Sequence, residues 1–368
     1  MSEQVKPIAL LSSSESWGGL EMNLLRIAET LRGHQHRVQL YLIEHSAIWL
    51  KAKELQFELR AIEGHRKYYD FGKARNLARL LKAEQVETLI FRDNFDMSLL
   101  VSTKYLLGNK IKLIYFQGMQ LGMPKRGLLH TLRFRALDAW LTPLPSLALQ
   151  ASQLTRIKAD KVHVVPLGRD FAIHKNEESR KLYRHNLDIP ENAFLAGILG
   201  RLDPAKGQDL LIKATALVQN ENLHLVFQGE TTKGEHRGFE QVLRESAQQF
   251  KIQDRVHFAE FDQNPAAFFS AIDLFVMASK RETFGMSTIE ALAAGVPVLG
   301  SDAGGTPEIL EEGKSGVLFK TLNEHDLAQK LIMLLSDEKL RIEKAKSGLS
   351  RSMDFTTEAM YSKLKPHL

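Results

Sequence analysis

The chain of 368 residues is long enough for two domains, and its 44% hydrophobic and 25% charged content excludes a disordered composition. It has no cysteine, which excludes a disulfide framework and a thiolate metal site and favours a cytoplasmic protein. No apolar run approaches the roughly 18 residues of a membrane span, and residues 7–11 are too short for a signal peptide.

The net charge of +5 is unevenly distributed. Residues 1–172 carry 25 Lys and Arg against 16 Asp and Glu, a balance of +9, whereas the rest carries 24 against 28, a balance of −4. This asymmetry suggests an anionic partner for the first half: a phosphorylated acceptor, an acidic membrane surface or nucleic acid. A solvated basic face is an equally good interpretation.

The densest basic segment is 125–140, where apolar residues alternate with cations at roughly helical spacing. The apolar residues are Leu128, Leu129, Leu132, Leu137 and Trp140. Its cations are Lys125, Arg126, Arg133 and Arg135. The pattern permits a helix lying on anionic lipid and equally an ordinary packed helix.

Apolar, strand-like runs alternate with helical patterns from the N-terminus onward. The predicted strands of the first half are 7–12, 37–43, 88–91, 112–116 and 139–142, with helices at 20–31 and 47–55. A second series of strands follows at 193–200, 223–228, 256–258, 274–277, 296–300 and 316–319. Such alternation predicts two doubly wound α/β domains, joined through residues 164–180.

Ligands of doubly wound sheets bind at the carboxyl ends of the strands, so the loops that follow strands are the places to inspect. The first such loop, 13–21, holds Gly18 and Gly19. It lacks the G-x-G-x-x-G pattern, which counts against a nicotinamide dehydrogenase. Its glycines let the backbone approach a phosphate or sugar, although a simple strand-to-helix turn is equally possible.

The second loop, 200–208, places Arg201 and Lys206 directly after a buried strand. Pro204 stiffens this loop and Gly207 ends it, so both cations can point at a phosphate group.

The third loop, 280–290, carries Glu282 and Glu290 on either side of a turn at Gly285. A helix that starts there forms an anion site because its first backbone amides have no partner within the helix. These amides belong to Gly285, Met286 and Ser287. This helix is predicted to end at Gly295. After the next strand, a second glycine turn at Gly304-Gly305 precedes another helix, and both turns should face the same crevice.

These motifs occur in the same order in a large family that the chain resembles over nearly its whole length, the retaining glycosyltransferase family 4 of GT-B fold. The motif residues are Gly18-Gly19, Arg201, Lys206-Gly207, Glu282, Phe284-Gly285, Glu290 and Gly304-Gly305. The resemblance implies two Rossmann-like domains facing across a deep cleft. Residues 1–172 would bind the acceptor and 173–352 the nucleotide-sugar donor, with a terminal helix, 353–368, packing back on the first domain.

The resemblance also implies roles for the crevice residues. Arg201 and Lys206 would neutralise the departing diphosphate, Glu282 would hold a hydroxyl of the donor sugar, and Glu290 would hold the ribose. Other implied donor contacts are Gly18, Gly19, Phe284, Gly285, Met286 and Ser287, with Gly304 and Gly305 near the sugar or acceptor. We expect neither a cofactor beyond the nucleotide-sugar nor a metal, in keeping with the lack of an Asp-x-Asp motif.

One position departs from the family pattern. Many members have a histidine after the strand that corresponds to 112–116, where this chain has Gln117. A glutamine can donate a hydrogen bond to a sugar but cannot carry a proton. Asp93 and Gln117 are possible acceptor contacts, although Asp93 and the nearby His130 are more often structural residues.

The sequence therefore predicts a retaining glycosyltransferase of the hexosyltransferase type. Its acceptor would be a glycan or glycolipid hydroxyl in bacterial envelope or extracellular polysaccharide synthesis. The basic cations at 125–135 would allow peripheral contact with the inner face of the cell membrane, and we expect no nucleic-acid partner. The alternatives are a GT-B sugar-nucleotide epimerase or phosphorylase, and a catalytically weak nucleotide-sugar binding protein.

Overall fold

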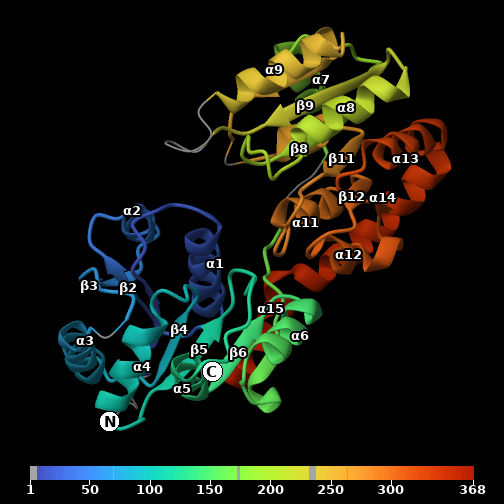
Figure 1. Cartoon of the computed structure of the whole chain (residues 1–368). Helices are drawn as coiled ribbons and strands as arrows, with labels where there is room; N and C mark the ends of the chain where they lie inside the picture. The colour runs from blue at the N-terminus through green and yellow to red at the C-terminus, as the bar shows by residue number, and fades with distance from the viewer. Residues whose placement is uncertain (1–5, 69, 172–174, 232–237, 263) are drawn as a thin grey trace. The chain divides into compact units, whose positions relative to one another are not determined.

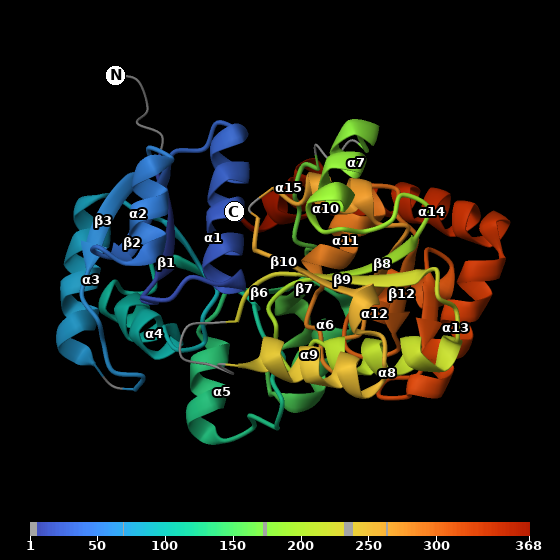
Figure 2. The ribbon, with the colours of Figure 1, turned by 90° about the horizontal axis from the view of Figure 1, so that it is seen from above.

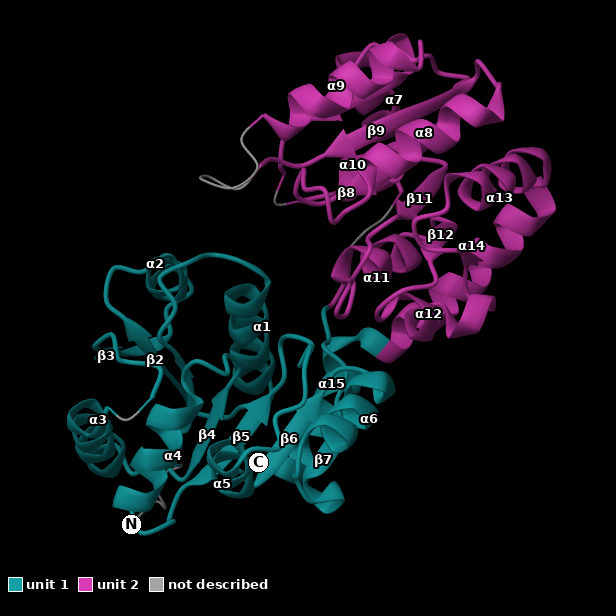
Figure 3. Cartoon of the chain, viewed as in Figure 1, with its two compact units in different colours: residues 1–169, 355–368 teal, residues 170–354 magenta. Residues whose placement is uncertain are grey.

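The computed structural model describes residues 6–68, 70–171, 175–231, 238–262 and 264–368. The chain divides into two compact units (Figure 3): unit 1 comprises Met1–Arg169 with Phe355–Leu368, and unit 2 comprises Asp170–Asp354. The first division lies three residues from the predicted 172/173 boundary, and the second lies two residues from the predicted 352/353 boundary.

Unit 1 is built on a parallel sheet of strand order β3-β2-β1-β4-β5-β6-β7 (Figure 1). Its strands are β1 (Ile8–Ser12), β2 (Val38–Ile43), β3 (Glu58–Ile62), β4 (Thr88–Phe91), β5 (Lys112–Phe116), β6 (Ala139–Thr142) and β7 (Val162–Val164). Residues of β1 and β4 are almost all buried, as expected for central parallel strands with helices on both faces. The sheet reverses its winding between β1 and β4, which is where a doubly wound fold binds ligands.

Helices cover both faces of this sheet. They are α1 (Gly19–Gly33), α2 (Ala47–Glu54), α3 (Phe71–Ala83), α4 (Met97–Leu106), α5 (Leu128–Arg135), α6 (Pro145–Leu154) and α15 (Thr357–Leu364), with 3₁₀ turns η1 (Ala159–Lys161) and η5 (Lys365–His367). Figures 1 and 2 show α1 and α2 on one face and α3 and α4 on the other. Right-handed crossovers on either side of β1 produce this arrangement.

The C-terminal segment of the chain belongs to unit 1. The N–H of Arg169 donates to the carbonyl of Phe355 at 2.9 Å, and a Cβ at Gly168 would lie 2.3 Å from the carbonyl of Thr356. Tyr361 on α15 stacks on His34 with ring centroids 3.5 Å apart. The close backbone approach at Gly168 therefore needs a glycine.

The segment 125–140 is not one amphipathic helix. The helix α5 ends at Arg135, and Leu137 and Trp140 are buried in the core of unit 1. Leu128 and Leu132 are 77% and 49% exposed, whereas Arg133 is buried. The helical pattern of this segment therefore holds only for Leu128–Arg135, whereas Trp140 lies on strand β6, at the predicted strand 139–142, and packs edge-on against Tyr115 and Phe134.

Unit 2 repeats the doubly wound plan with strand order β10-β9-β8-β11-β12-β13. Its strands are β8 (Phe194–Leu199), β9 (Leu223–Gln228), β10 (Val256–Ala259), β11 (Leu274–Met277), β12 (Val298–Ser301) and β13 (Val317–Phe319). Its helices are α7 (Glu177–Asn186), α8 (Gln208–Val218), α9 (Phe239–Gln249), α10 (Ala266–Ala271), α11 (Met286–Ala293), α12 (Thr306–Ile309), α13 (Glu324–Ser336) and α14 (Glu338–Ser352). The 3₁₀ turns are η2 (Gln253–Arg255), η3 (Glu311–Gly313) and η4 (Met353–Phe355).

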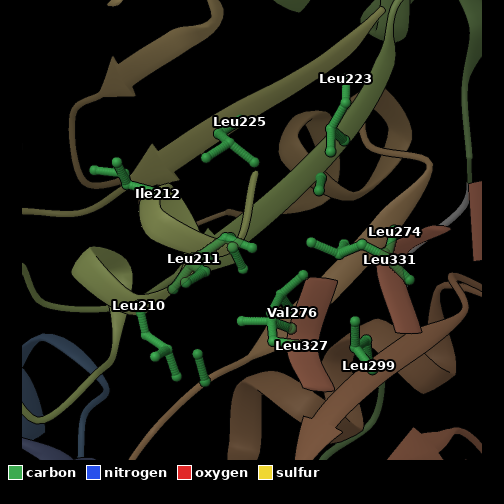
Figure 4. Close-up of a cluster of buried hydrophobic side chains, with 14 of the residues drawn as sticks. Leu210, Leu211, Ile212, Leu223, Leu225, Leu274, Val276, Leu299, Leu327 and Leu331 are labelled. Carbon is green, nitrogen blue, oxygen red and sulfur yellow. The ribbon is translucent and has the colours of Figure 1, made fainter. Parts of the chain in front are cut away.

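The core of unit 2 is aliphatic (Figure 4). Leu211, Leu225, Val276, Leu299 and Leu331 are buried together between the sheet and the helices α8 and α13. Burying a side chain of this size contributes roughly 1.5–3 kcal/mol relative to leaving it exposed. This core fixes the positions of the strand ends from which the candidate site is built.

A buried arginine joins α7 to the sheet of unit 2. Arg184, 1% exposed, donates to the carbonyl of Ala271 through both Nε and NH2, and its NH1 donates to the carbonyl of Ala193 at 2.8 Å. NH2 also bonds to the carboxylate of Asp273 at 2.8 Å. The guanidinium is thus paired on every nitrogen, as a buried charge requires.

Candidate functional site

The three loops that follow β8, β11 and β12 lie side by side, because these strands are neighbours in the sheet of unit 2. Two backbone hydrogen bonds connect them. The N–H of Lys280 donates to the carbonyl of Ala205 at 2.9 Å, and the N–H of Gly305 donates to the carbonyl of Glu282 at 2.8 Å. The predicted crevice residues of this domain are therefore held at one edge of one sheet.

Two of the predicted catalytic side chains form an ion pair. Lys206 Nζ lies 2.8 Å from Glu282 Oε2, and the two side chains are 26% and 17% exposed. The contact joins residues 76 positions apart and is partly shielded from water. Each group holds the other in a single geometry, so that an incoming anion meets an ammonium group already in place.

Two glycines make this loop packing possible. Gly207 has φ of 76°, and a Cβ there would lie 2.3 Å from the carbonyl of Ala278. Gly304 has φ of 62°, and its Cβ would lie 2.1 Å from the carbonyl of Glu282. Both positions combine a left-handed backbone with a close approach to another chain segment, which only glycine tolerates.

The helix α11 begins at a glycine rather than at a capping side chain. Gly285 is its N-cap with φ of 87°, and the N–H of Thr288 turns back to the carbonyl of Gly285 at 3.0 Å. Within the described ranges, the amides of Met286 and Ser287 have no hydrogen-bond acceptor. By contrast, side chains cap the helices α2, α3, α7, α13, α14 and α15. The start of α11 thus has the amide donors of the predicted anion site.

Buried hydroxyl groups lie in the first turns of α11 and α12. The Oγ1 atoms of Thr288 and Thr306 have no hydrogen-bond partner among the described residues, and both side chains are fully buried. Sequence reasoning missed both residues, although each follows a predicted glycine turn within three positions. A buried hydroxyl group without a partner is costly, so it is a rare feature of a purely structural position.

The remaining predicted residues of this domain lie around the same loops. Phe284 and Glu290 are buried, with Glu290 one turn inside α11. Arg201 is exposed at the start of the β8 loop, and its carbonyl accepts a hydrogen bond from Gln208 at 2.9 Å. The structure therefore brings Lys206, Glu282 and the first turn of α11 together and leaves the Arg201 side chain at the surface of unit 2.

Gly18 and Gly19, predicted to contact the donor, lie in the other unit at the start of α1. Gly18 is the N-cap of that helix, and a Cβ there would lie 3.5 Å from Glu21 Oε2. The buried carboxylate of Glu21 therefore turns back toward the helix N-terminus, where negative charge is favourable.

Gln117 is a buried structural residue. Its Nε2 donates to the carbonyl of Met119 at 2.8 Å, and its Oε1 accepts from Trp140 Nε1 at 2.9 Å. The side chain is fully buried, so both amide atoms serve the interior of unit 1. Both amide atoms of Gln117 are thus held by residues of unit 1, and its role as an acceptor contact stays a prediction.

Asp93 lies at the carboxyl edge of the unit 1 sheet, directly after β4. Burial raises the pKa of its carboxyl group. A hydrogen bond from the N–H of Phe95 lowers this pKa, whereas the charges of Asp96 and Glu21 raise it. The neighbouring Asp96 lies between Ser13 and His65, with 2.9 Å to His65 Nε2. Several carboxylates thus gather at the edge where the acceptor was predicted to bind.

Arg92 is a residue that sequence reasoning did not single out. Its side chain is 4% exposed, and its Nε and NH1 have no hydrogen-bond partner in the described part of the chain. It lies over the ring of Phe116, 5.1 Å from the centroid, and burial lowers the pKa of its guanidinium to about 10. No periodicity reveals such a residue, since only packing shows that it lacks partners.

Among the described residues, no group of three or more His, Asp or Glu side chains could hold a metal ion. In the same part of the chain, no helix is both long and apolar enough to cross a bilayer.

Comparisons with known proteins place unit 2 among glycosyltransferase sequences. Residues 179–349 match the model of the family described as glycosyl transferases group 1. A D-inositol 3-phosphate glycosyltransferase from Stackebrandtia nassauensis is 31% identical over 227 residues, covering 60% of this chain and 51% of the relative. The chain spans about half the length of the curated relatives it matches.

Solved structures resemble the chain over nearly its whole length. A glycosyltransferase from Rickettsia africae has a TM-score of 0.88 at 16% identity, covering 99% of this chain and 98% of that one. HepE from Anabaena, in complex with UDP and glucose, has a TM-score of 0.83 at 20% identity, covering 99% of both chains. At these identities the likeness shows the fold, which is GT-B. The match of residues 179–349, which lie in unit 2, shows that this part of the chain is similar to glycosyl transferases group 1.

Proposed function

We propose that the chain is a retaining glycosyltransferase of the hexosyltransferase type that moves a sugar from a nucleotide-sugar donor to a hydroxyl of a glycan or glycolipid. The observation that carries this proposal is the Lys206–Glu282 pair, 2.8 Å apart, in a domain that matches the family. The amides at the start of α11 lie on the same loop as Glu282. HepE, which shares the fold, binds UDP and glucose.

In this proposal, unit 2 binds the donor. The diphosphate would accept hydrogen bonds from the Met286 and Ser287 amides and would attract Lys206, which leaves the Glu282 carboxylate for a hydroxyl of the sugar. A cation at about 4 Å supplies roughly 4 kcal/mol of Coulomb energy at an effective dielectric near 20. Two cations, Lys206 and Arg201, with a helix N-terminus would then replace a metal ion at the leaving group.

Unit 1 would bind the acceptor and contact the membrane surface. Leu128 and Leu132 are exposed one turn apart on α5, and the exposed Arg126 and Arg135 flank them. Exposed leucines beside cations fit the interface of an anionic bilayer. This supports peripheral attachment to the inner face of the cell membrane and an acceptor from envelope or extracellular polysaccharide synthesis.

The donor is tested by thermal shift and calorimetry with a panel of UDP-, GDP- and ADP-sugars. A donor that binds the native state raises the melting temperature. Lys206→Ala should abolish the shift, whereas Lys213→Ala, which removes an exposed lysine of α8, should retain it. The proposal fails if no nucleotide-sugar binds, or if the bound sugar is epimerised without an acceptor. Tight donor binding without turnover on any glycolipid extract would favour a binding protein instead.

The membrane part has its own test. Leu128→Ser with Leu132→Ser should abolish co-sedimentation with phosphatidylglycerol vesicles and leave the melting temperature unchanged, because both side chains are exposed. Equal binding to neutral vesicles would contradict the electrostatic contribution of Arg126 and Arg135.

A further inference from the structure

Unit 2 holds a cavity of about 570 Å³ at the edge of its sheet opposite to the predicted donor loops. Those loops follow the ends of β8, β11 and β12, whereas the cavity lies where the same three strands begin. Its other walls are the first turn of α7 and the helix α14. Its size is that of a small-molecule site, about 300–1,000 Å³. None of the residues predicted to bind the donor or the acceptor lines it.

Part of the cavity wall is apolar. Ile272 is 1% exposed, Pro297 is buried and Phe194 is half-buried at the edge of the sheet. Ala345 and the exposed Ile342 add apolar surface from α14. An apolar group that covers these side chains is favoured, because it removes their surface from water. A bare inorganic ion would leave that surface wet.

The polar side chains of the cavity have donors to spare. Lys175 Nζ donates to the carbonyl of Gly295 at 3.2 Å, and its ammonium group has two further N–H bonds. Asn176 uses its Oδ1 to cap α7, and Arg341 lies 5.2 Å from the centroid of the Phe194 ring and uses NH1 for carbonyls at the end of α13. In the described part of the chain, Asn176 Nδ2 and the Nε and NH2 of Arg341 have no acceptor.

The acceptors of the cavity are occupied or lie at its rim. Asp273 has Oδ1 at 3.2 Å from Arg180 NH2, and its Oδ2 accepts from Arg184 NH2 at 2.8 Å. Glu177 and Glu338 are exposed residues in the first turns of α7 and α14, where negative charge favours the helix N-termini. A ligand that satisfies the spare donors must therefore bring its own acceptors, and an anionic group does so best.

Lys175 also connects the cavity to the candidate site. The carbonyl of Gly295 follows the last turn of α11, and the first turn of the same helix presents the amides of Met286 and Ser287. A cation at the C-terminal end of a helix complements the helix dipole. Burial lowers the pKa of Lys175, Asp273 raises it and Arg180 lowers it. An anion bound in the cavity would neutralise this lysine and weaken the pull of the α11 amides on a diphosphate.

We propose that this cavity binds a small organic anion with an apolar body, such as an aromatic carboxylate or sulfonate, and that the bound anion lowers the affinity for the donor. The anionic group would accept hydrogen bonds from Lys175, Asn176 and Arg341, and the apolar body would cover Phe194 and Ile272. The effect on the donor rests on the proposed function, whereas the binding site does not.

The probe is anilinonaphthalene sulfonate, an aromatic sulfonate whose fluorescence rises in apolar surroundings, titrated into the full chain. Lys175→Gln should weaken its binding at least about tenfold, since a hydrogen bond to a charged group is lost. Ala345→Trp should abolish binding by filling the cavity. The matched controls are Lys181→Gln, at an exposed position of α7, and Leu349→Trp, at an exposed position of α14 outside the cavity. Both controls should bind the probe as the unmodified chain does.

Probe binding that survives in Ala345→Trp would overturn the proposal. Loss in Ala345→Trp with full binding in Lys175→Gln would refute anion recognition, as would equal affinity for the neutral anilinonaphthalene that lacks the sulfonate. Loss of the probe in the Leu128→Ser, Leu132→Ser variant would place it on α5 and refute the site in unit 2.

The nucleotide-sugar panel, repeated with saturating probe, tests the effect on the donor. The probe should weaken donor binding roughly two- to fivefold, the size of a helix-dipole contribution, and the effect should then level off because the sites are separate. Displacement that grows without limit would mean one shared site and refute the proposal. Probe binding that depends on Lys175, without any nucleotide-sugar binding, would leave the cavity site standing and refute the glycosyltransferase. Donor binding that the probe does not change would leave the glycosyltransferase standing and refute the coupling.

Discussion

Arg92 and Arg184 are both buried arginines, and we expect the same substitution to change stability in opposite directions. Arg92 is 4% exposed and has no partner for Nε or NH1 among the described residues. Arg184 is 1% exposed and bonds to backbone carbonyls and to Asp273. Replacement by methionine removes the charge and keeps most of the apolar stem.

The change in unfolding free energy expected for Arg92→Met follows from the pKa of Arg92. Burial lowers this pKa from 12.5 to about 10, which corresponds to about 3 kcal/mol of destabilisation at neutral pH, where the group is charged in both states. The contact with the Phe116 ring, 5.1 Å away, returns roughly 1–2 kcal/mol. Arg92→Met should therefore raise the free energy of unfolding of unit 1 by about 1–2 kcal/mol.

Arg184→Met should instead destabilise unit 2 by about 3–5 kcal/mol, because it leaves Asp273 and several carbonyls without their donor. Urea unfolding resolves the two units, since Trp17, Trp49 and Trp140 all lie in unit 1 and report its transition by fluorescence. Far-UV circular dichroism reports the unfolding of both units. A loss of more than 1 kcal/mol in Arg92→Met would refute the reasoning, as it would mean that the guanidinium has a stabilising partner.

Three further results are expected. Lys206→Ala should lower the transfer rate about 10²–10³-fold with unchanged folding, since it removes a preorganised contact to the leaving group. Steady-state kinetics with the identified donor measures this effect, and a decrease of less than tenfold would contradict the prediction. Gly304→Ala should destabilise unit 2 by at least 1–3 kcal/mol, because its Cβ would lie 2.1 Å from the Glu282 carbonyl at φ of 62°; denaturant unfolding by circular dichroism measures this. Burial lowers the pKa of His224 from 6.5 to about 4, helped by His257, so the neutral form is favoured in the folded state. The stability of unit 2 should then be complete above pH 6.5 and fall by roughly 2–3 kcal/mol as the pH approaches 4. His224→Gln should flatten this dependence and the exposed His325→Gln should not.

The order of strands and helices was readable from the sequence, because it depends on local patterns. Apolar runs of strand length alternate with helical patterns, and the predicted strands 88–91, 112–116, 139–142, 223–228 and 274–277 coincide with β4, β5, β6, β9 and β11. Glycine turns were also visible, since Gly285 and Gly304 must adopt a left-handed backbone in any fold that turns there. From these patterns alone one obtains two doubly wound sheets and the loops at their carboxyl edges.

Side-chain partners were not readable, because they depend on which strands become neighbours. Lys206 and Glu282 were predicted to have separate roles, and the adjacency of β8 and β11 makes them an ion pair. Gln117 was predicted to be a possible acceptor contact, and the pairing of β5 with β6 brings Trp140 to its amide oxygen, a partner that no local pattern indicates. Segment 125–140 has one continuous pattern, but the sheet takes its second part as β6 and buries Arg133 beside His130.

The sequence by itself therefore determined the elements and the strand-end loops in which the site is predicted, since hydrophobic periodicity and glycine turns are local properties of the chain. Only the tertiary structure decided which cations are paired, as in Lys206 and Arg184, and which lack a partner among the described residues, as in Arg92. Those properties arise from contacts between residues far apart in the chain, and no local pattern encodes them.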